Sequence, residues 1–323
     1  MKVLQGVYPF LVRLNTMLWY GGGVILCNKL RWMSRFYFLA FSPLPLAWID
    51  RYDAIVCYYA WHHRLLRLER AGAKVIVDTG DVMADRHERI GARRWISMTL
   101  EDEKAVLTSG SRCLAVSTDD VDEFERLHGV RLDRLSFVPP EHAKLVEITS
   151  ADVPQRVGFM GAPSYVNEEI LRLLSAPAFL GCLREANIEF LLAGGICDTA
   201  DRSILDTLRN AGARILGRIL STVDYYSQIS ATVNPVGPST GVKIKSVETL
   251  IAGRILITTR WGADAELAAA FPEQIVYIDW PIAPGALGRL CVQAVRSAIP
   301  PSRGAGEAYA RNAERALREV LSK

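Results

Sequence analysis

From residue 54 onward, short apolar runs alternate with longer stretches whose apolar positions recur at helical spacing. Continuous apolar runs of about four to eight residues beside turn residues are typical of strands buried on both faces, and a period of about 3.6 indicates amphipathic helices. The alternation therefore predicts parallel sheets covered by helices. Strands are expected in 54–60, 74–80, 113–118, 156–161, 189–195, 213–219, 231–237, 254–260 and 274–280.

Helical patterns fill the intervals between these strands. They are expected at 62–72, 95–110, 119–129, 167–177, 201–212 and 222–230, with a last helix toward the end of the chain. The alternation breaks at residues 139–155, which predicts two Rossmann-like domains, 1–145 and 146–323, with the last helix able to pack back on the first domain. Ligands of such sheets bind beyond the carboxyl ends of the strands, so the site is expected in a cleft that the two domains face.

The first fifty residues fit this scheme less well. Segments 2–10 and 20–28 are strand candidates, but little room is left there for further strand–helix units. The N-terminal domain is therefore expected to be abbreviated.

Composition narrows the class of protein. The chain has 323 residues, of which 50% are hydrophobic, and its formal net charge of +3 is too small to favour nucleic acid as a partner. Its six cysteines form no CxxC pair, and none combines with a histidine at zinc-site spacing, so a reducing, cytoplasmic compartment and no metal site are expected. No secretory signal is apparent in the sequence.

One early segment leaves two interpretations open. Residues 36–49 are apolar, but they are too short to span a bilayer and contain two prolines. A buried strand and loop is one interpretation. The other is peripheral contact with anionic lipid, because basic and aromatic side chains surround the segment: Arg31, Arg35, Arg51, Trp32, Tyr37 and Trp48.

The stretch GPSTGVKIKSVETLIAG, residues 237–253, follows a predicted strand and opens a predicted helix. Ser239 or Thr240 is expected to cap that helix, and Gly241 lets a ligand approach the backbone. Lys243 and Lys245 lie at the positive end of the helix dipole, where a bound anion would offset their repulsion. Glu248 lies further along the same helix. The alternative is that Lys245 and Glu248 pair on the helix surface.

The block YSQISATVNPVGPSTGVKIKSVETLIAGRILITT resembles the donor-binding segment of GT-B glycosyltransferases of the family-4 (group 1) type. RVGFMGAPSYVNEEILRLL and EFLLAGG are similar to earlier steps of the same domain. VIVDTGDVMADRHERI is similar to an N-domain stretch of bacterial relatives that often reads D-T-H-D-V and then S-D-R. The resemblance covers residues 54–280 and hardly touches 1–50.

The resemblance implies transfer of a sugar from a nucleotide-diphosphate donor to a glycan or lipid-linked acceptor, with retention and without a bound metal or cofactor. It implies that Glu248 accepts hydrogen bonds from ribose. The diphosphate would meet Lys243, Lys245 and the N–H groups of residues 240–242 (Thr240, Gly241 and Val242), with Gly161 leaving backbone room and Ser239 beside them. Lys243 is favoured over Lys245 because it is nearer the turn.

This sequence departs from the family's pattern at two positions. Thr240 stands where many members carry the first of two glutamates, which helps to hold the donor sugar, and Gly80 stands where relatives often carry histidine. These departures leave open a catalytically degenerate protein that binds a nucleotide sugar. A GT-B nucleotide-sugar epimerase is a further alternative, and it would need an acid–base pair in the cleft.

In the first domain, DTGDVMADRHERI follows a strand end. Asp81 is a candidate to orient an acceptor hydroxyl, and the alternative is that it caps the next helix. Asp85 and Arg86 are expected to form a structural ion pair.

Overall fold

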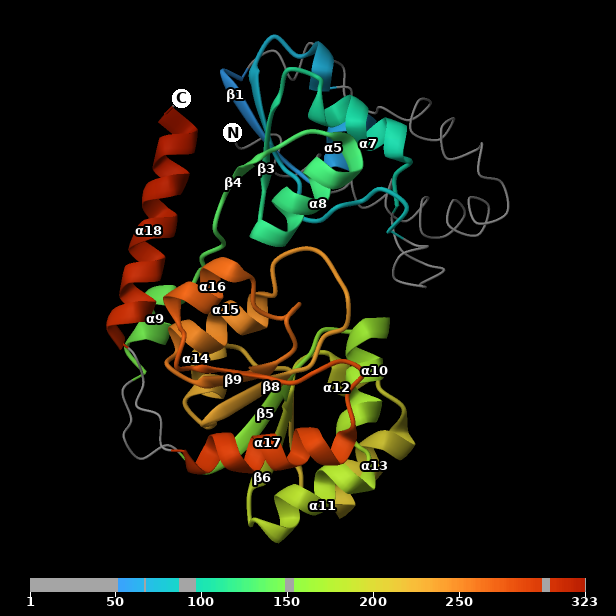
Figure 1. Ribbon diagram of the computed structural model, residues 1–323, viewed down its shortest axis with the longest axis vertical. Helices are drawn as coiled ribbons and strands as arrows, with labels where there is room; N and C mark the ends of the chain where they lie inside the picture. The colour runs from blue at the N-terminus through green and yellow to red at the C-terminus, as the bar shows by residue number, and fades with distance from the viewer. Residues whose placement is uncertain (1–51, 67, 87–96, 149–153, 298–302, 323) are drawn as a thin grey trace. The chain divides into compact units, whose positions relative to one another are not determined.

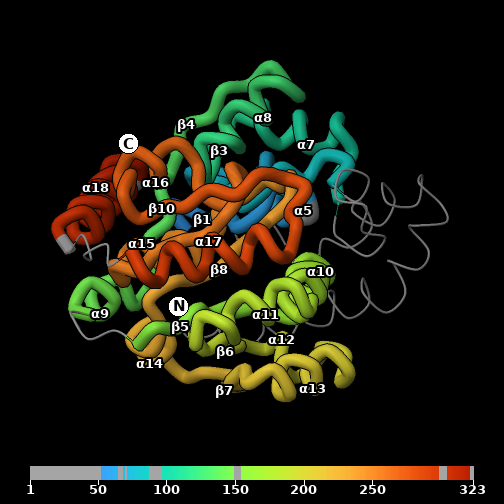
Figure 2. Tube along the Cα trace, turned by 60° about the horizontal axis from the view of Figure 1, so that its bottom comes forward, coloured from blue at the N-terminus to red at the C-terminus, as the bar shows by residue number. Residues whose placement is uncertain are grey.

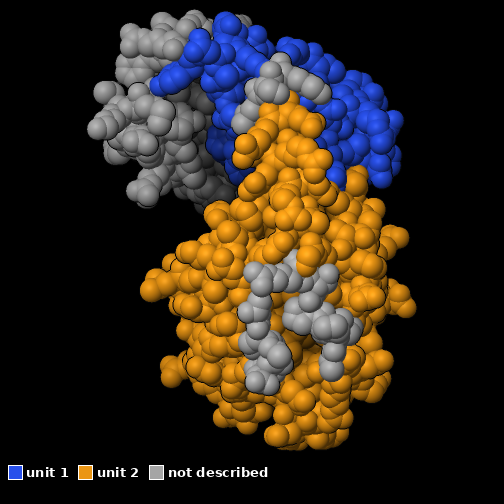
Figure 3. Space-filling view, turned by 90° about the vertical axis from the view of Figure 1, so that its left-hand side faces the viewer, with its two compact units in different colours: residues 1–116, 120–134 blue, residues 117–119, 135–323 orange. Residues whose placement is uncertain are grey.

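The computed structural model describes residues 52–66, 68–86, 97–148, 154–297 and 303–322. The described residues belong to two compact units, one within 1–116 and 120–134 and the other within 117–119 and 135–323 (Figure 3). The apolar segment 36–49, for which a buried strand and loop or contact with lipid were both open, and the strand candidates before residue 51 lie outside the described residues.

Unit 1 is built on a parallel sheet in the order β1-β2-β3-β4, of which β1, β3 and β4 are labelled in Figure 1. The buried side chains of β2 and β3 join those of two helices, so that Val77, Ala115, Val106 and Phe124 share one core. The elements are β1 (Ala54–Tyr58), α5 (Ala60–Leu66), η2 (Leu68–Arg70), β2 (Lys74–Asp78), α7 (Leu100–Leu107), β3 (Arg112–Ala115), α8 (Thr118–His128) and β4 (Asp133–Arg134).

Unit 2 is built on a six-stranded parallel sheet in the order β10-β9-β8-β5-β6-β7. The first of these six strands along the chain, β5, lies in the middle of the sheet and pairs with both β6 and β8. Strands β6 and β7 are added on one side of β5. The chain then crosses back, and β8, β9 and β10 are added on the other side. The strands are β5 (Arg156–Met160), β6 (Glu189–Ala193), β7 (Arg214–Gly217), β8 (Ala231–Asn234), β9 (Ile255–Thr258) and β10 (Ile275–Tyr277).

Helices cover both faces of this sheet, which explains why the buried positions of its central strands are mostly apolar. On one face, Leu192 and Ile257 pack with α10 (Tyr165–Leu174), α11 (Pro177–Glu185), α13 (Arg202–Asn210) and α17 (Pro284–Arg296). α11 and α17 lie side by side (Figures 1 and 2). On the other face, Leu191 and Leu256 pack with α9 (His142–Val146), α14 (Thr222–Tyr226), α15 (Ile244–Ile251) and α16 (Ala265–Ala270). A short α12 (Ile196–Thr199) follows β6.

The last helix, α18 (Arg303–Ser322), belongs to unit 2 and contacts α9 and α15. The His142 Nε2 atom lies 3.2 Å from Oε1 of Glu314, and the Tyr309 hydroxyl donates to the Phe137 carbonyl at 3.3 Å. These contacts tie the end of the chain to the segment that enters unit 2.

The predicted α/β class with parallel sheets is confirmed, and the departures are local. The helix expected at 95–110 begins only at Leu100, because the Thr99 hydroxyl accepts from the Asp102 N–H as its N-cap. The short edge strand β4 was not among the predicted strands. Helix α11 was not expected at all.

Candidate functional site

The carboxyl ends of β5 and β8 mark the point where the chain reverses its direction of building in the sheet of unit 2. In open parallel sheets, the loops on either side of such a point run apart and leave a crevice, where ligands bind. The loop after β5 begins at Gly161 and leads into α10, and the loop after β8 runs through residues 235–243 into α15. The stretch 237–253 that the sequence singled out therefore begins at this edge.

The beginning of α15 differs from the expectation. The helix starts at Ile244 with Lys243 at the N-cap, and no side chain caps it. Neither Ser239 nor Thr240 is the cap, because they lie too far before the first turn, and the Ser239 hydroxyl instead donates to the Gly237 carbonyl at 3.0 Å. The predicted cap was wrong, and the side chain at the N-cap position accepts no hydrogen bond from the first turn.

Lys243 holds the turn that precedes the helix. Its Nζ donates to the carbonyls of Thr240 at 2.8 Å and of Gly241 at 2.6 Å. Gly241 has a φ of +81°, a conformation that glycine adopts without strain. Val242 is partly buried beside it and packs at the edge of the core. The ammonium of Lys243 thus rests on carbonyls of its own loop.

Lys245 points toward the other side of the crevice. Its Nζ donates to Oδ1 of Asn167 on α10 at 2.9 Å and lies 4.5 Å from the centre of the Phe159 ring on β5. Asn167 is oriented by its own amide, which donates to the Ala162 carbonyl at 2.8 Å. Burial lowers the pKa of Lys245 to about 7, with Glu248 opposing the shift and Lys243 adding to it.

Glu248 lies one turn further into α15 and is 8% exposed. Its Oε2 accepts a hydrogen bond from the Tyr226 hydroxyl at 3.1 Å. This buried contact was not predicted, and it differs from the surface pairing with Lys245 that the sequence left open. Burial raises the pKa of Glu248 to about 7. The hydrogen bond from Tyr226 opposes this shift, and the nearby carboxylate of Glu141 adds to it. The site therefore contains a cation and an anion whose charges both change near neutral pH.

Gly161 is required by packing within unit 2. A Cβ on Gly161 would lie 3.0 Å from Ile196 and 3.2 Å from the Phe159 ring, and its carbonyl accepts from the Ile196 N–H at 2.9 Å. Gly194, at a φ of +94°, has no room for a Cβ against the same carbonyl. The loops after β5 and β6 are thus in direct backbone contact.

In unit 1, the loop after β2 carries the acidic candidates. Asp81 is 9% exposed, and its Oδ2 lies 2.8 Å from Nη2 of Arg86. The ion pair expected between Asp85 and Arg86 was therefore assigned to the wrong carboxylate. Asp85 has a φ of +46°, and its N–H donates to the Met98 carbonyl at 2.9 Å.

The space beside the Cα atom of Gly80 is filled by a neighbouring side chain. The φ of Gly80 is +69°, and a Cβ there would lie 2.5 Å from the ring of Tyr59. Tyr59 itself has a φ of +67°, which is unusual for an aromatic residue. The aromatic ring takes the space into which a side chain at position 80 would project.

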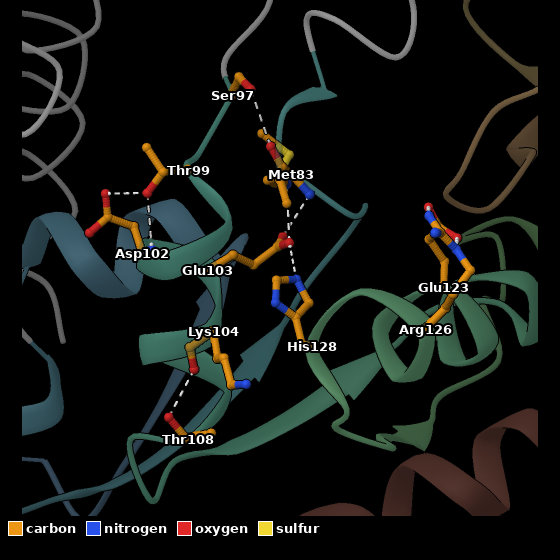
Figure 4. Close-up of polar contacts among 11 residues, drawn as sticks. Met83, Ser97, Thr99, Asp102, Glu103, Lys104, Thr108, Glu123, Arg126 and His128 are labelled. Carbon is orange, nitrogen blue, oxygen red and sulfur yellow. Dashed lines mark hydrogen bonds and ion pairs between the residues drawn. The ribbon is translucent and has the colours of Figure 1, made fainter. Parts of the chain in front are cut away.

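A buried pair that sequence reasoning missed holds this loop in place (Figure 4). The carboxylate of Glu103 on α7 accepts from the Met83 N–H at 2.6 Å and the Ala84 N–H at 3.1 Å. Nε2 of His128 lies 2.8 Å from the same carboxylate, and both side chains are fully buried. Glu103 is one of three consecutive acids in LEDEKAVL, so its type gave no signal of this role, although its place on the apolar face of the helical pattern was the available clue.

The structure brings Lys245, Asn167, Glu248, Tyr226 and the 237–243 turn together in unit 2. Asp81 and Arg86 belong to unit 1. No helix in the described ranges has both the length and the apolarity needed to cross a bilayer.

No family model and no curated protein sequence matches the chain. Solved structures do, and those most similar include glycosyltransferases of the GT-B fold. TarM from S. aureus, in complex with fondaparinux, alpha-GlcNAc-glycerol and UDP, superposes with a TM-score of 0.62 at 11% identity, covering 86% of this chain and 57% of TarM. HepE from Anabaena, in complex with UDP and glucose, gives a TM-score of 0.59 at 11% identity, covering 86% of this chain and 80% of HepE.

A glycosyltransferase from Rickettsia africae gives a TM-score of 0.60 at 13% identity, covering 89% of this chain and 80% of its own. At such low identity these likenesses show the fold and no more. Together with the two parallel sheets, they establish an α/β protein of the GT-B class of folds.

Proposed function

We propose that this chain transfers a sugar from a nucleotide-diphosphate donor to a glycan or lipid-linked acceptor. The observation that carries the proposal is the hydrogen bond between Lys245, which is partly buried, and Asn167. It joins the helices that follow β5 and β8, the two neighbouring strands at which the strand order changes direction. A cation held at that crevice, beside an uncapped helix start, suits a diphosphate. Neighbours of the same fold bind UDP, in one case with glucose, which supports a nucleotide sugar as the ligand.

The chemistry that such a site must perform is stabilisation of a leaving group. When the bond between the sugar and the terminal phosphate breaks, negative charge develops on the diphosphate, and fixed cations and N–H groups lower the barrier. Lys245 and the N–H groups of residues 240–242 would meet that charge, and Gly161 lets the loop after β5 pack closely against Ile196 beside them. No metal or cofactor is required in this scheme, and the outcome at the anomeric carbon is retention.

The roles of the two lysines follow from their contacts. Lys243 is bonded to its own turn, so it would shape the loop that carries Ser239 and Thr240 toward the sugar. Lys245 would exchange its bond with Asn167 for a bond to phosphate, and binding would restore its full charge. Glu248 would accept from ribose hydroxyls. Asp81, paired with Arg86, would act on the acceptor side. A cytoplasmic protein in peripheral contact with the membrane suits a lipid-linked acceptor.

A thermal-shift titration with UDP, GDP, ADP and their sugars, run beside Lys245→Met, tests the proposal. A ligand present at about 100 times its Kd should stabilise the protein by about 2.7 kcal/mol. A shift with one nucleotide, absent in the variant, would support the donor site, and release of nucleoside diphosphate with an acceptor would then establish transfer. Binding without release would favour the degenerate binding protein. No shift with any nucleotide from a folded sample would refute the donor site.

A further inference from the structure

Three consecutive loops at the carboxyl edge of unit 2 place two tryptophans beside the 237–243 turn. Gly237 follows β8, Trp261 follows β9 and Trp280 follows β10. Because β8, β9 and β10 are neighbours in a parallel sheet, these loops leave the sheet at the same edge. The edge is the one where Lys245 and Asn167 meet, and the tryptophans extend it on the side away from β6 and β7.

The two indole rings form a fixed pair. Their centroids are 6.4 Å apart and their planes are perpendicular, the edge-to-face arrangement that the ring quadrupoles favour. Trp261 is partly buried against the core of unit 2, while Trp280 is 49% exposed. One ring thus supports the other, and the outer ring meets solvent.

Trp280 lies directly against the turn. A Cβ built on Gly237 would be 3.1 to 3.5 Å from three atoms of its six-membered ring, so the missing side chain at Gly237 leaves just enough room for the indole. The guanidinium of Arg260, an exposed residue, lies 4.4 Å from the centre of the Trp261 ring and adds hydrogen-bond donors beside the pair.

Hydrogen bonds to the neighbouring strands hold these loops. The Thr258 hydroxyl donates to the Asn234 carbonyl at 2.6 Å, and the Thr259 hydroxyl donates to the Val236 carbonyl. The Ile278 N–H donates to the Thr258 carbonyl at 2.8 Å. The aromatic pair is therefore attached to rigid backbone on both sides, which is what a surface needs in order to select a ligand by shape.

We infer that Trp280, supported by Trp261 and seated on Gly237, is the platform on which the transferred sugar of the donor lies, and that it helps to determine which sugar is accepted. The inference rests on the proposed function. One face of a pyranose presents C–H groups, which suit the negative face of an indole, while its hydroxyls need polar neighbours such as the Arg260 guanidinium.

The position of the platform favours the donor sugar as its occupant. Strands β8 and β10 are two steps apart in the sheet, roughly 10 Å, and Trp280 reaches back from β10 over the turn that follows β8. A sugar linked to a phosphate held at the β5–β8 crevice extends in one of two directions along this edge. On the β9–β10 side it meets the turn and the exposed indole.

Calorimetric titration of Trp280→Ala with the nucleotide sugar that stabilises the wild type most, and separately with the parent nucleoside diphosphate, tests the inference. We expect affinity for the nucleotide sugar to fall about tenfold or more, equivalent to about 1.4 kcal/mol, while affinity for the nucleoside diphosphate changes less than about twofold. Trp280→Phe should retain most of the extra affinity for the nucleotide sugar over the nucleoside diphosphate. Gly237→Ala, which displaces the ring, should show the same pattern more weakly.

Trp61→Ala removes a tryptophan of unit 1 and should change neither affinity. If Trp280→Ala is unstable, Trp280→Leu keeps an apolar side chain without a π face and should show the same loss. Equal losses for both ligands, or no loss for either, would overturn the inference, as would a variant that binds the donor normally but raises the acceptor KM. Failure of the proposed function is distinct, because the wild type would then bind no nucleotide.

Discussion

The ammonium of Lys245 donates to the side-chain oxygen of Asn167 at 2.9 Å and so joins two residues that are 78 positions apart in the chain. Asn167 lies in the helix after β5, and Lys245 lies in the helix after β8. These two strands are adjacent in the sheet, although five helices and two strands separate them in sequence. The contact therefore spans the crevice that the strand order creates, where a diphosphate would bind.

Replacing Lys245 with methionine should weaken binding of a nucleoside diphosphate by about tenfold or more, because it removes a desolvated cation with little change in volume. Isothermal calorimetry on the folded variant measures this. Lys243→Met is the matched comparison, and its loss should be smaller, because that ammonium already rests on the carbonyls of its own turn. A larger loss for Lys243→Met would reverse the two roles.

Binding of inorganic pyrophosphate should strengthen as the pH falls from 8 to 6. Burial lowers the pKa of Lys245 to about 7, so its amine is mostly neutral at pH 8 and charged at pH 6 in the empty site. The gain should be about tenfold, the change in the charged fraction over that range. Pyrophosphate lacks the ribose that Glu248 is proposed to bind, but Glu248 also loses its proton over this range. The Lys245→Arg variant keeps Glu248 and therefore separates the two groups. The dependence should be much weaker in Lys245→Arg, whose guanidinium stays charged throughout, and an equal dependence there would assign the effect to another group.

The free energy of unfolding should fall as the pH rises from about 5 to above 7, in part because of Glu248. Its folded pKa is raised to about 7 by burial, so between its unfolded pKa and pH 7 the folded state binds the extra proton. That contribution is fully present below the unfolded pKa and is lost as the pH rises through 7. Glu248→Gln should remove the decline and be more stable than the wild type at pH 8 by about 1–2 kcal/mol.

Urea denaturation of both proteins at pH 5 and pH 8 measures this difference. The stability gain of the variant should be absent at pH 5, where both side chains are neutral. The same variant should bind a nucleoside diphosphate less well at pH 8, because an amide is a weaker acceptor for ribose hydroxyls than a carboxylate. A variant that gains no stability at pH 8 would show that Tyr226 and Lys245 compensate the buried charge fully.

Glu103 should stabilise the protein by holding the loop after β2. Truncation to alanine leaves the buried N–H groups of Met83 and Ala84 without their acceptor, at about 1–3 kcal/mol each, and removes the partner of His128. We expect a loss of about 2–5 kcal/mol in the free energy of unfolding, measured by denaturant titration. Glu125→Ala, on the exposed side of α8, should change stability by less than about 1 kcal/mol. A loss for Glu103→Ala no larger than this would show that water replaces the carboxylate.

The sheets could be predicted from sequence because their central strands are buried on both faces and therefore apolar throughout. Residues 157–160, 190–193 and 255–258 are continuous runs of apolar or small residues, and each lies in a strand. Helix α11 was missed because PAFLGCLRE is short and contains a glycine, although Pro177 at its first turn was a usable start signal.

The site was only partly predictable, for reasons that lie beyond local pattern. The 237–253 segment could be found from its small residues and lysines. Which lysine contacts the helix after β5 depends on Asn167 and Phe159, and these residues lie too far away in the sequence for a local pattern to show the contact. The acid that pairs with Arg86 could not be chosen by proximity in sequence. Asp85 adopts a positive φ that turns the chain, so the more distant Asp81 becomes the partner.

Gly80→Ala should destabilise the protein more than Gly129→Ala, and the difference measures the contact with Tyr59. Both glycines have nearly the same backbone conformation, with φ values of +69° and +67°, so both variants bear the strain of a side chain there, about 1–2 kcal/mol. A Cβ on Gly129 meets nothing within 4 Å, whereas one on Gly80 would lie 2.5 Å from the Tyr59 ring.

We therefore expect the Gly80 variant to lose at least about 1 kcal/mol more than the Gly129 variant in denaturant titrations. The double variant Gly80→Ala, Tyr59→Ala should recover part of that difference, because removing the ring removes the clash. Equal losses for the two single variants would mean that the ring of Tyr59 relaxes freely. The space beside Gly80 would then be open to a ligand instead of being filled by the protein's own side chain.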